Sequence, residues 1–287
     1  MNKRQFSEYL INKTLFLSVS ILIALILLIL MFTLKEAIPA FYDVGFSNFI
    51  AGSNWSPDNG QFGIFPMILG SIYITGIALI IAVPLAISCA IYLEEIASHK
   101  LKNIFKPVIQ TLAGIPSVIY GFFGLTLIVP FVRDVFGGSG FSILAASIVL
   151  AFMILPTIVS LTQDAIKAVP DYYREASFGI GSTHWQCIKS IILPIAMPGI
   201  ITAIILGMGR AIGETLAVLM LAGNVSNMPS SIISPVRTLT SNIALEMGYA
   251  TGIHYNSLFA TAIVLFVVIM ILMVISIYVQ NKYALKR

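Results

Sequence analysis

The sequence REASFGIGSTHWQCIKSIILP, from Arg174 to Pro194, organises the interpretation of the whole chain. It is polar, yet it lies between two long apolar segments. Asp171 is placed to cap a first short helix, and Gly181 suits a left-handed C-terminal cap. Thr183 and Gln186 then have the spacing of a capping box before the next apolar run. The stretch therefore predicts a helix–corner–helix at a membrane surface, a shape that a groove in a partner protein can receive.

The composition is that of a polytopic membrane protein. Hydrophobic residues make up 58% of the 287 residues and charged residues only 10%, whereas a soluble domain carries about 25% charged residues. The net charge of +4 does not indicate nucleic-acid binding, because the basic residues are scattered at segment ends. No P-loop, catalytic motif or metal-ligand spacing occurs in the sequence. We therefore expect no catalytic residue, no metal site and no cofactor in this chain.

Six apolar segments predict an all-α fold with six membrane spans. They are 14–34, 65–93, 107–132, 141–162, 193–221 and 257–280. Residues 1–13 precede the first span, 35–64 form an external loop, and 281–287 form a basic tail. A core of five spans covers 65–280 and includes the polar loop 163–192. The first span could instead be a cleaved signal peptide, but its apolar run is long and no cleavage site follows it.

Lysine and arginine counts predict the orientation of these spans. Six spans place both termini on one side. Three basic residues fall in each of the N-terminal segment, the 94–106 loop, the 163–192 loop and the tail, twelve in all. The opposite side has only Lys35, Arg133 and Arg237. The excess predicts that both termini and the polar loop are cytoplasmic.

A charged pair lies inside the predicted fifth span. Arg210 and Glu214 are one helical turn apart, and a charge at mid-bilayer costs at least about 2.5–3.5 kcal/mol on insertion scales. Such residues face a bundle interior or an aqueous path, so we expect Arg210 to bind an anion and Glu214 to hold it in place. A structural ion pair that fixes helix register is the alternative. Gly209 and Gly213 form a stripe expected to pack against a neighbouring helix.

Gly114 and Pro116 interrupt the predicted third span. On physical grounds this break, together with Gly121 and Gly124, indicates a bent, closely packed helix more readily than a gate.

The polar stretch resembles the EAA loop of the membrane subunits of binding-protein-dependent ABC importers. In that motif Glu-Ala-Ala is followed by three residues, a glycine, nine residues and Ile-x-Leu-Pro. Here Ser177 replaces the second alanine, and the remaining matches are Glu175, Ala176, Gly181, Ile191, Leu193 and Pro194. Residues 54–87, 113–125, 209–224 and 238–248 further resemble the phosphate subfamily, and its PstC type of subunit more than its PstA type.

This resemblance implies a type I importer permease in the inner membrane. The implied partners are a second, PstA-like permease, a dimer of PstB-like ATPases that binds ATP and Mg²⁺, and an external PstS-like phosphate-binding protein. Inorganic phosphate would be the transported substrate, and the spans would be surrounded by membrane lipid. The EAA-loop residues would then couple the ATPase to the spans, and Arg210 and Glu214 would take part in transport.

Two alternatives remain open at this point. A permease for sulfate or molybdate would share the loop. An ATP-independent carrier or channel would not need a binding surface for an ATPase.

Overall fold

The computed structural model describes residues 3–284, with side chains for 11–278, 280 and 281, and it is almost entirely helical. In chain order the helices are α1 (Lys3–Ala40), α2 (Phe46–Ala51), α3 (Phe65–Ile91), α4 (His99–Ala113), α5 (Ser117–Phe123), α6 (Val129–Phe136), α7 (Ile143–Lys167), α8 (Asp171–Gly179), α9 (His184–Cys187), α10 (Leu193–Gly213), α11 (Leu216–Leu221), α12 (Leu239–Glu246) and α13 (Gly252–Ala284). A small hairpin of β1 (Trp55–Ser56) and β2 (Gln61–Phe62) precedes α3. Five-residue π-helical turns connect several helices, at Phe41–Gly45, Tyr92–Ile96, Gly124–Ile128 and Ile188–Ile192.

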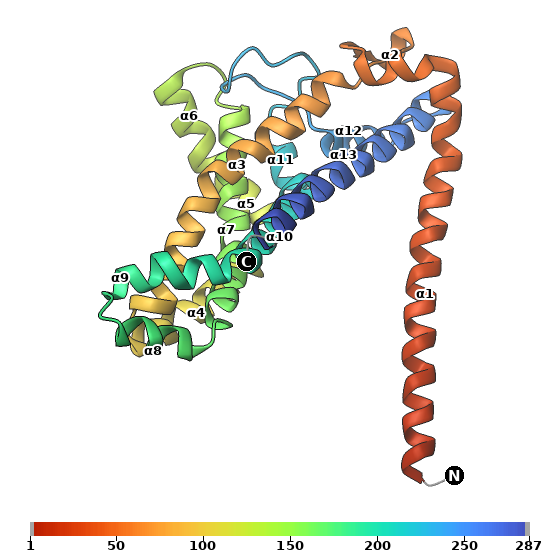
Figure 1. Cartoon of the computed structure of the whole chain (residues 1–287). Coiled ribbons are helices and arrows are strands. Elements are labelled where there is room, and N and C mark those ends of the chain that lie inside the picture. Colours follow the sequence, from red (N-terminus) through yellow and green to blue (C-terminus); the bar gives the residue numbers. More distant parts are fainter. Residues whose placement is uncertain (1–2, 285–287) are drawn as a thin grey trace.

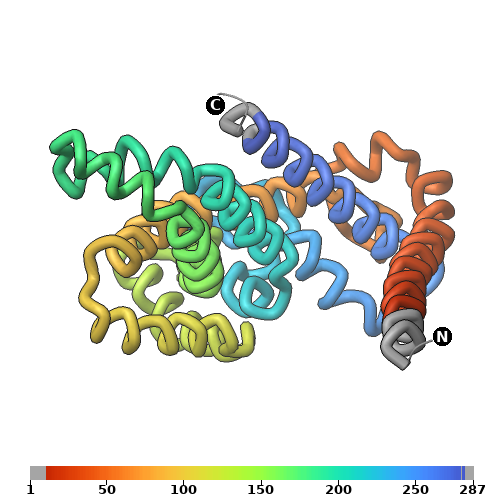
Figure 2. Tube along the Cα trace, turned by 60° about the horizontal axis from the view of Figure 1, so that its bottom comes forward, coloured from red at the N-terminus to blue at the C-terminus, as the bar shows by residue number. Residues whose placement is uncertain are grey.

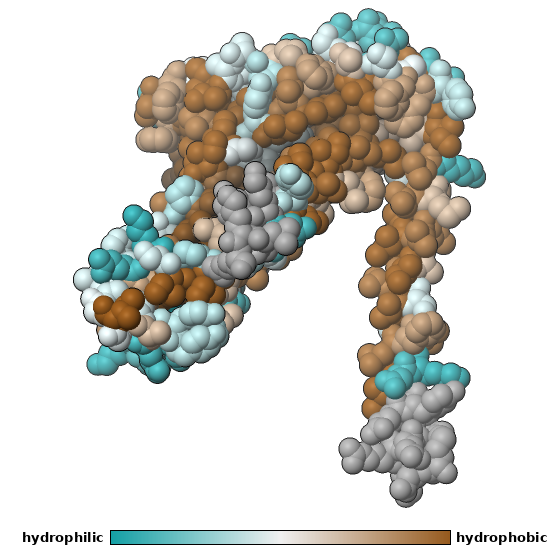
Figure 3. Space-filling view, viewed as in Figure 1, coloured by the Kyte–Doolittle hydropathy of each residue, from teal (hydrophilic) through white to brown (hydrophobic). Residues whose placement is uncertain are grey.

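Six helical stretches within the described residues are long and apolar enough to cross a membrane. They are Ile11–Ala51, Phe65–Ile96, Ser117–Phe136, Ile143–Lys167, His184–Gly213 and Gly252–Tyr278. Figure 3 shows a broad hydrophobic surface between two more polar ends of the molecule. The predicted all-α, six-span architecture is confirmed.

Helix α7 lies at the centre of the bundle. Of its most apolar 18-residue window, 67% is buried, and the helix packs against both α3 and α10. Ser142 caps its first turn by accepting a hydrogen bond from the Ala145 backbone nitrogen at 3.1 Å. The α8 and α9 helices lie at one end of the bundle, and α2, α6 and the 222–238 loop lie at the other (Figure 1).

Helix α1 stands apart from this bundle. None of its most apolar window is buried, and it packs against α13. Figures 1 and 2 show it as a separate arm that meets the other helices only near its α2 end. Its apolar surface is therefore free to contact lipid or another chain.

Several boundaries differ from the sequence prediction. The first helix continues through the predicted start of the external loop at residue 35 and ends at Ala40. The rest of the 35–64 segment is folded as a π-helical turn, α2 and the hairpin. Residues 1–2 of the predicted N-terminal segment and 285–287 of the predicted tail lie outside the described residues. The described parts of these two segments continue α1 and α13.

The prediction of one bent span over 107–132 is wrong. The chain forms two separate elements, α4 and the span Ser117–Phe136, because the helix ends at Ala113 and Pro116 disfavours helical backbone in the residue before it. Helix α4 presents charged residues on one side and so lies outside the spans.

Candidate functional site

The predicted fifth span is broken beside its charged residues. Helix α10 ends at Gly213, and Glu214 has extended backbone with a ψ of 130° before α11 begins. The prediction of a continuous helix to Leu221 is therefore wrong. Two glycines within five residues, at 209 and 213, weaken the helix here. The break changes which groups the two charged side chains can reach.

Glu214 contacts the first turn of α11. Its Oε1 accepts a hydrogen bond from the backbone nitrogen of Ala217 at 3.1 Å, and its carbonyl accepts one from the Thr240 hydroxyl at 3.0 Å. A carboxylate at a helix N-terminus satisfies free N–H groups and meets the positive end of the helix dipole. The predicted ion pair with Arg210 is absent from the described part of the chain, because the helix that would have aligned the two residues ends between them.

Arg210 is bonded to neutral groups. Its Nη1 donates to the Thr157 hydroxyl of α7 at 3.1 Å, and its Nη2 approaches the Ala113 carbonyl at the end of α4 at 3.4 Å. The guanidinium is half-buried, and no carboxylate of the described residues forms an ion pair with it. A cation held by a hydroxyl and a helix-terminal carbonyl keeps its charge available to an anion.

The Gly114–Pro116 break supplies one of these groups. Helix α4 ends at Ala113, so the carbonyl of Ala113 has no partner further along that helix. The predicted close packing occurs at Gly121 and Gly124, where a Cβ would lie 2.7 Å from Met220 and from Leu221 respectively. It does not occur at Gly114, where a Cβ would meet nothing nearer than the Thr111 carbonyl oxygen, at 3.4 Å. Sequence analysis identified the break but not its contact with Arg210, which joins residues 97 positions apart.

The predicted Gly209–Gly213 stripe has no close neighbour within this chain. A Cβ at Gly209 would reach only the Met273 methyl group at 3.8 Å, and one at Gly213 would meet nothing within 4 Å. Close packing occurs instead at Gly207, where a Cβ would lie 2.6 Å from Ile158. Within the described residues, the stripe therefore remains uncovered.

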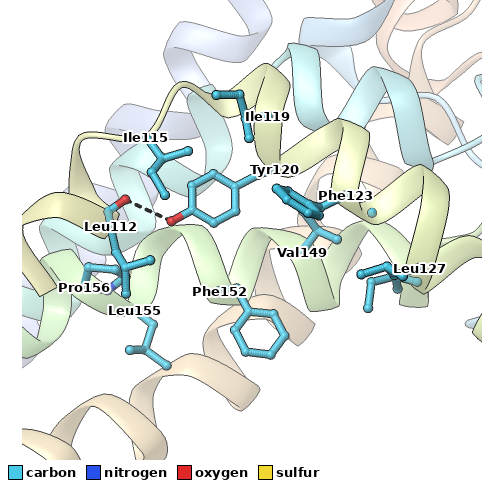
Figure 4. Close-up of a pocket in the computed structure, with 12 residues that line it drawn as sticks. Leu112, Ile115, Ile119, Tyr120, Phe123, Leu127, Val149, Phe152, Leu155 and Pro156 are labelled. Atoms are coloured by element: carbon cyan, nitrogen blue, oxygen red, sulfur yellow. Dashed lines mark hydrogen bonds between the residues drawn. The ribbon is translucent and has the colours of Figure 1, made fainter. Parts of the chain in front are cut away.

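A cavity of about 390 Å³ lies beside the break but is apolar. Its walls come from the end of α4, from α5 and from α7, and the Tyr120 hydroxyl in it donates to the Leu112 carbonyl at 2.9 Å. Figure 4 shows aliphatic and aromatic side chains, including Phe123 and Phe152, around this space. An anion would lose its hydration there without gaining hydrogen bonds, so this cavity is not the anion site.

A polar stripe leads away from Arg210 along α7. Thr157, Ser160, Asp164 and Lys167 recur at three- and four-residue spacing and so share one face of the helix. The last three of these line a cavity of about 190 Å³ between α7 and α4. Its other walls include the cations Lys102 and Lys106, together with Glu94 and His99.

The EAA-like loop folds as two short helices with a corner. Gly181 has a φ of +84°, and Thr183 and Gln186 form both hydrogen bonds of a capping box, so these two predictions are confirmed. The predicted cap at Asp171 is wrong, because Pro170 occupies the cap position. Asp171 pairs with Arg174 at 3.2 Å instead.

The motif residues divide into an exposed and a buried set. Glu175 and Ala176 on α8 are exposed, whereas Ser177, the departure from the motif, is buried and hydrogen-bonded to Ser182 across the corner. Ile191 and Leu193 are half-buried where the loop enters α10, and Pro194 is exposed in the first turn of that helix.

Two groups of functional interest were missed by sequence analysis. Thr157 carried no signal beyond being a hydroxyl in an apolar span. The carboxylate of Glu95, in the π-helical turn after α3, contacts Arg174 and His184 of the loop. The described residues contain no group of three or more His, Cys, Asp or Glu side chains that could hold a metal ion.

The chain matches a known protein family over most of its length. Residues 82–284 match the family described as binding-protein-dependent transport system inner membrane component. A probable ABC transporter permease protein, YqgH, of Bacillus subtilis (strain 168) is 41% identical over 239 residues, covering 82% of this chain and 77% of the relative. The phosphate transport system permease protein PstC of Haemophilus influenzae is 34% identical over 280 residues, covering 91% and 88% of the two chains.

Solved structures share the fold. A bacterial alginate ABC transporter superposes with a TM-score of 0.65 at 17% identity, covering 93% of this chain and 94% of that one. An inward-facing form of the MetNI methionine ABC transporter gives 0.62 at 18% identity, covering 77% and 95%. These two likenesses concern the arrangement of helices alone.

Proposed function

This chain belongs to the binding-protein-dependent transport system inner membrane components, and from that premise we propose that it is a permease subunit of an ATP-driven phosphate importer. It is a multi-pass inner-membrane protein and not an enzyme. The phosphate assignment follows the PstC relatives, which span most of its length.

The observation that carries the proposal is the state of Arg210. A guanidinium inside a membrane span is held by the Thr157 hydroxyl and the Ala113 carbonyl, with no carboxylate to neutralise it among the described residues. Its planar set of N–H donors matches the geometry of phosphate oxygens. An incoming phosphate would therefore meet a cation already oriented by neutral groups.

The polar stripe on α7 supplies a route away from that site. Phosphate leaving Arg210 would pass the hydroxyl of Ser160 and reach the cavity lined by Lys102, Lys106 and Lys167. Lys102 is 3.7 Å from the Glu94 carboxylate, so part of the positive charge there is already balanced. A weakly basic exit attracts an anion without retaining it.

The exposed face of the EAA-like loop is the surface for the ATPases. It presents Glu175 and Ala176 beside large exposed side chains, among them Tyr172, Ile180 and Trp185. Contiguous exposed apolar groups rimmed by polar ones are typical of protein-binding surfaces. In this arrangement two ATPase subunits hydrolyse ATP with Mg²⁺, and the loop and both termini of this chain face the cytoplasm.

The remaining partners follow from the same architecture. A second permease would cover the uncovered faces of α1 and of the Gly209–Gly213 stripe. An external binding protein would deliver phosphate to the end of the bundle that carries α2, α6 and the 222–238 loop. Closing of the ATPases on ATP would move the coupling loops, open the spans outward and admit phosphate to Arg210, and hydrolysis would reset them.

The test is uptake of labelled phosphate by vesicles reconstituted with both permeases, the ATPase and the binding protein, with ATP inside. Excess sulfate and molybdate serve as competitors. We expect ATP-dependent uptake that neither competitor removes. Arg210→Gln should abolish it, while Arg133→Gln, which removes an exposed cation, should not. Transport of sulfate or molybdate in place of phosphate would overturn the assignment of phosphate as the transported anion. Uptake without the ATPase would overturn the assignment as an ATP-driven importer.

A further inference from the structure

Glu95 reaches both helices of the coupling loop from outside that loop. It lies in the π-helical turn Tyr92–Ile96 that continues α3, and its side chain is only 6% exposed. One carboxylate oxygen lies 2.8 Å from Nη2 of Arg174 on α8, and the other lies 3.7 Å from Nε2 of His184 on α9. The buried carboxylate is therefore hydrogen-bonded to α8, and it also lies against α9, at a distance longer than a hydrogen bond.

Arg174 extends this connection to α7. Its Nη1 donates to the Val169 carbonyl at 2.8 Å, and its Nη2 lies 3.3 Å from the Ile166 carbonyl. Ile166 lies in the last turn of α7 and Val169 lies just beyond its C-cap, Ala168, at the end of the helix where the dipole favours a cation. The same guanidinium thus binds α8 to the ends of the two most closely packed helices of the bundle, α3 and α7.

The pair is charged and fixed in place. Burial lowers the pKa of Arg174, but the hydrogen bond and charge of Glu95, together with the charges of Asp171 and Cys187, raise it by more, so the pKa lies above the ordinary arginine value. A buried ion pair with extra hydrogen bonds has one favourable geometry, and breaking it leaves an uncompensated charge. Such a connection transmits displacement, whereas an exposed pair between flexible side chains does not.

The connection ends at the anion site. Helix α7 carries Thr157, whose hydroxyl binds Arg210. Any displacement of α8 that Arg174 passes to the end of α7 therefore reaches the helix that orients the transported anion.

Resting on the proposed function, we propose that Glu95 is a positioning residue for energy coupling. Through Arg174 and His184 it makes the corner of the coupling loop move as one body with the ends of α3 and α7. Without it the ATPases would still bind the exposed face of the loop, but their closure would be transmitted poorly to Arg210.

The experiment compares ATP hydrolysed with phosphate imported by the reconstituted four-component transporter. Glu95→Gln should raise the number of ATP molecules used per phosphate by about fivefold, the low end of typical coupling between sites, while the complex still assembles. Glu36→Gln is the control: it removes a carboxylate that lies near the Asn256 amide, outside both the coupling loop and the proposed phosphate route. The control should retain the ratio of the unaltered transporter.

A double-mutant cycle distinguishes transmission from simple stabilisation. Arg174→Gln alone and the double variant with Glu95→Gln should give the same raised ratio, because both remove one connection. Glu95→Asp, which keeps the charge, should recover part of the normal ratio. A lowered Tm with an unchanged ratio in Glu95→Gln would overturn the proposal, leaving the pair a structural contact only.

Failure of the proposed function would look different. It would appear as absent phosphate uptake by the unaltered transporter. In that case the number of ATP molecules used per imported anion would be measured with sulfate or molybdate, whichever is transported. The role of Glu95 would then be tested on that number, by the same criteria.

Discussion

Glu214 accepts a hydrogen bond from the backbone nitrogen of Ala217, in the first turn of α11, at 3.1 Å. A typical intramolecular hydrogen bond contributes about 1 kcal/mol to stability. Glu214→Ala should lower the free energy of unfolding by that amount, and Glu214→Gln by less because the amide oxygen can still accept. Thermal unfolding of the purified permease complex measures both.

The hydrogen bond between Glu214 and Ala217 also predicts which of two variants loses more phosphate uptake. The carboxylate does not hold Arg210, so Glu214→Gln should reduce phosphate uptake less than Arg210→Gln does. Equal loss of uptake in the two variants would mean that the negative charge of Glu214 is itself needed during transport.

Thr157 orients Arg210 through a hydrogen bond of 3.1 Å. A hydrogen bond to a charged group contributes about 1.5–3 kcal/mol, and each 1.4 kcal/mol is a factor of ten. Thr157→Val should therefore lower kcat/KM for phosphate uptake about tenfold. Thr126→Val is the control, because that hydroxyl bonds only to carbonyls of its own helix. A loss of equal size in the control would contradict the role of Thr157.

The fold could be predicted from sequence because it depends on long apolar runs. A span of about 20 apolar residues must be helical in lipid, since no water can satisfy its backbone groups. The local features of the loop, Gly181 and the Thr183–Gln186 box, were also predictable, because their partners lie within a few residues.

The candidate site could be predicted only in part. Arg210 was recognisable as a charge inside a span. Its partner Thr157 lies 53 positions away and Ala113 lies 97 positions away, so no local pattern reports either contact. The break between Gly213 and Glu214 was missed because the apolar run continues across it, and composition alone does not locate a helix end.

Gly207 and Gly209 illustrate the same limit and permit a matched test. The two glycines are on one helix, but only at Gly207 would a Cβ clash, lying 2.6 Å from Ile158. Gly207→Ala should lower the free energy of unfolding by about 1–3 kcal/mol through overpacking. Gly209→Ala should be neutral or slightly stabilising, because alanine favours helix. The comparison is made by thermal unfolding, and a greater loss in Gly209→Ala would place the close contact on the predicted stripe after all.

Gly181 is required because of its left-handed backbone conformation, and not because a side chain at this position would clash with a neighbour. Its φ is +84°, and no atom lies within 4 Å of where a Cβ would be. Left-handed backbone costs an alanine about 1–2 kcal/mol, so Gly181→Ala should distort the corner between α8 and α9. We expect the loaded binding protein to stimulate ATP hydrolysis less in this variant. Gly179→Ala is the control, since its site is equally open and its φ is not positive.

Glu246 joins four segments at the end of the bundle opposite the coupling loop. Its carboxylate, 7% exposed, lies 2.6 Å from Nη1 of Arg237 and 2.8 Å from Nε2 of His254, and it accepts a hydrogen bond from the Trp55 indole at 2.9 Å. Removing one member of a buried charged cluster costs about 3–5 kcal/mol, because the partners lose their compensating charge. Glu246→Gln should therefore lower the Tm of the permease substantially. Asp134→Asn, in an exposed pair with Arg133, should change stability by less than about 1 kcal/mol. Similar Tm values for the two variants would show that the Glu246 cluster contributes no more to stability than a surface ion pair does.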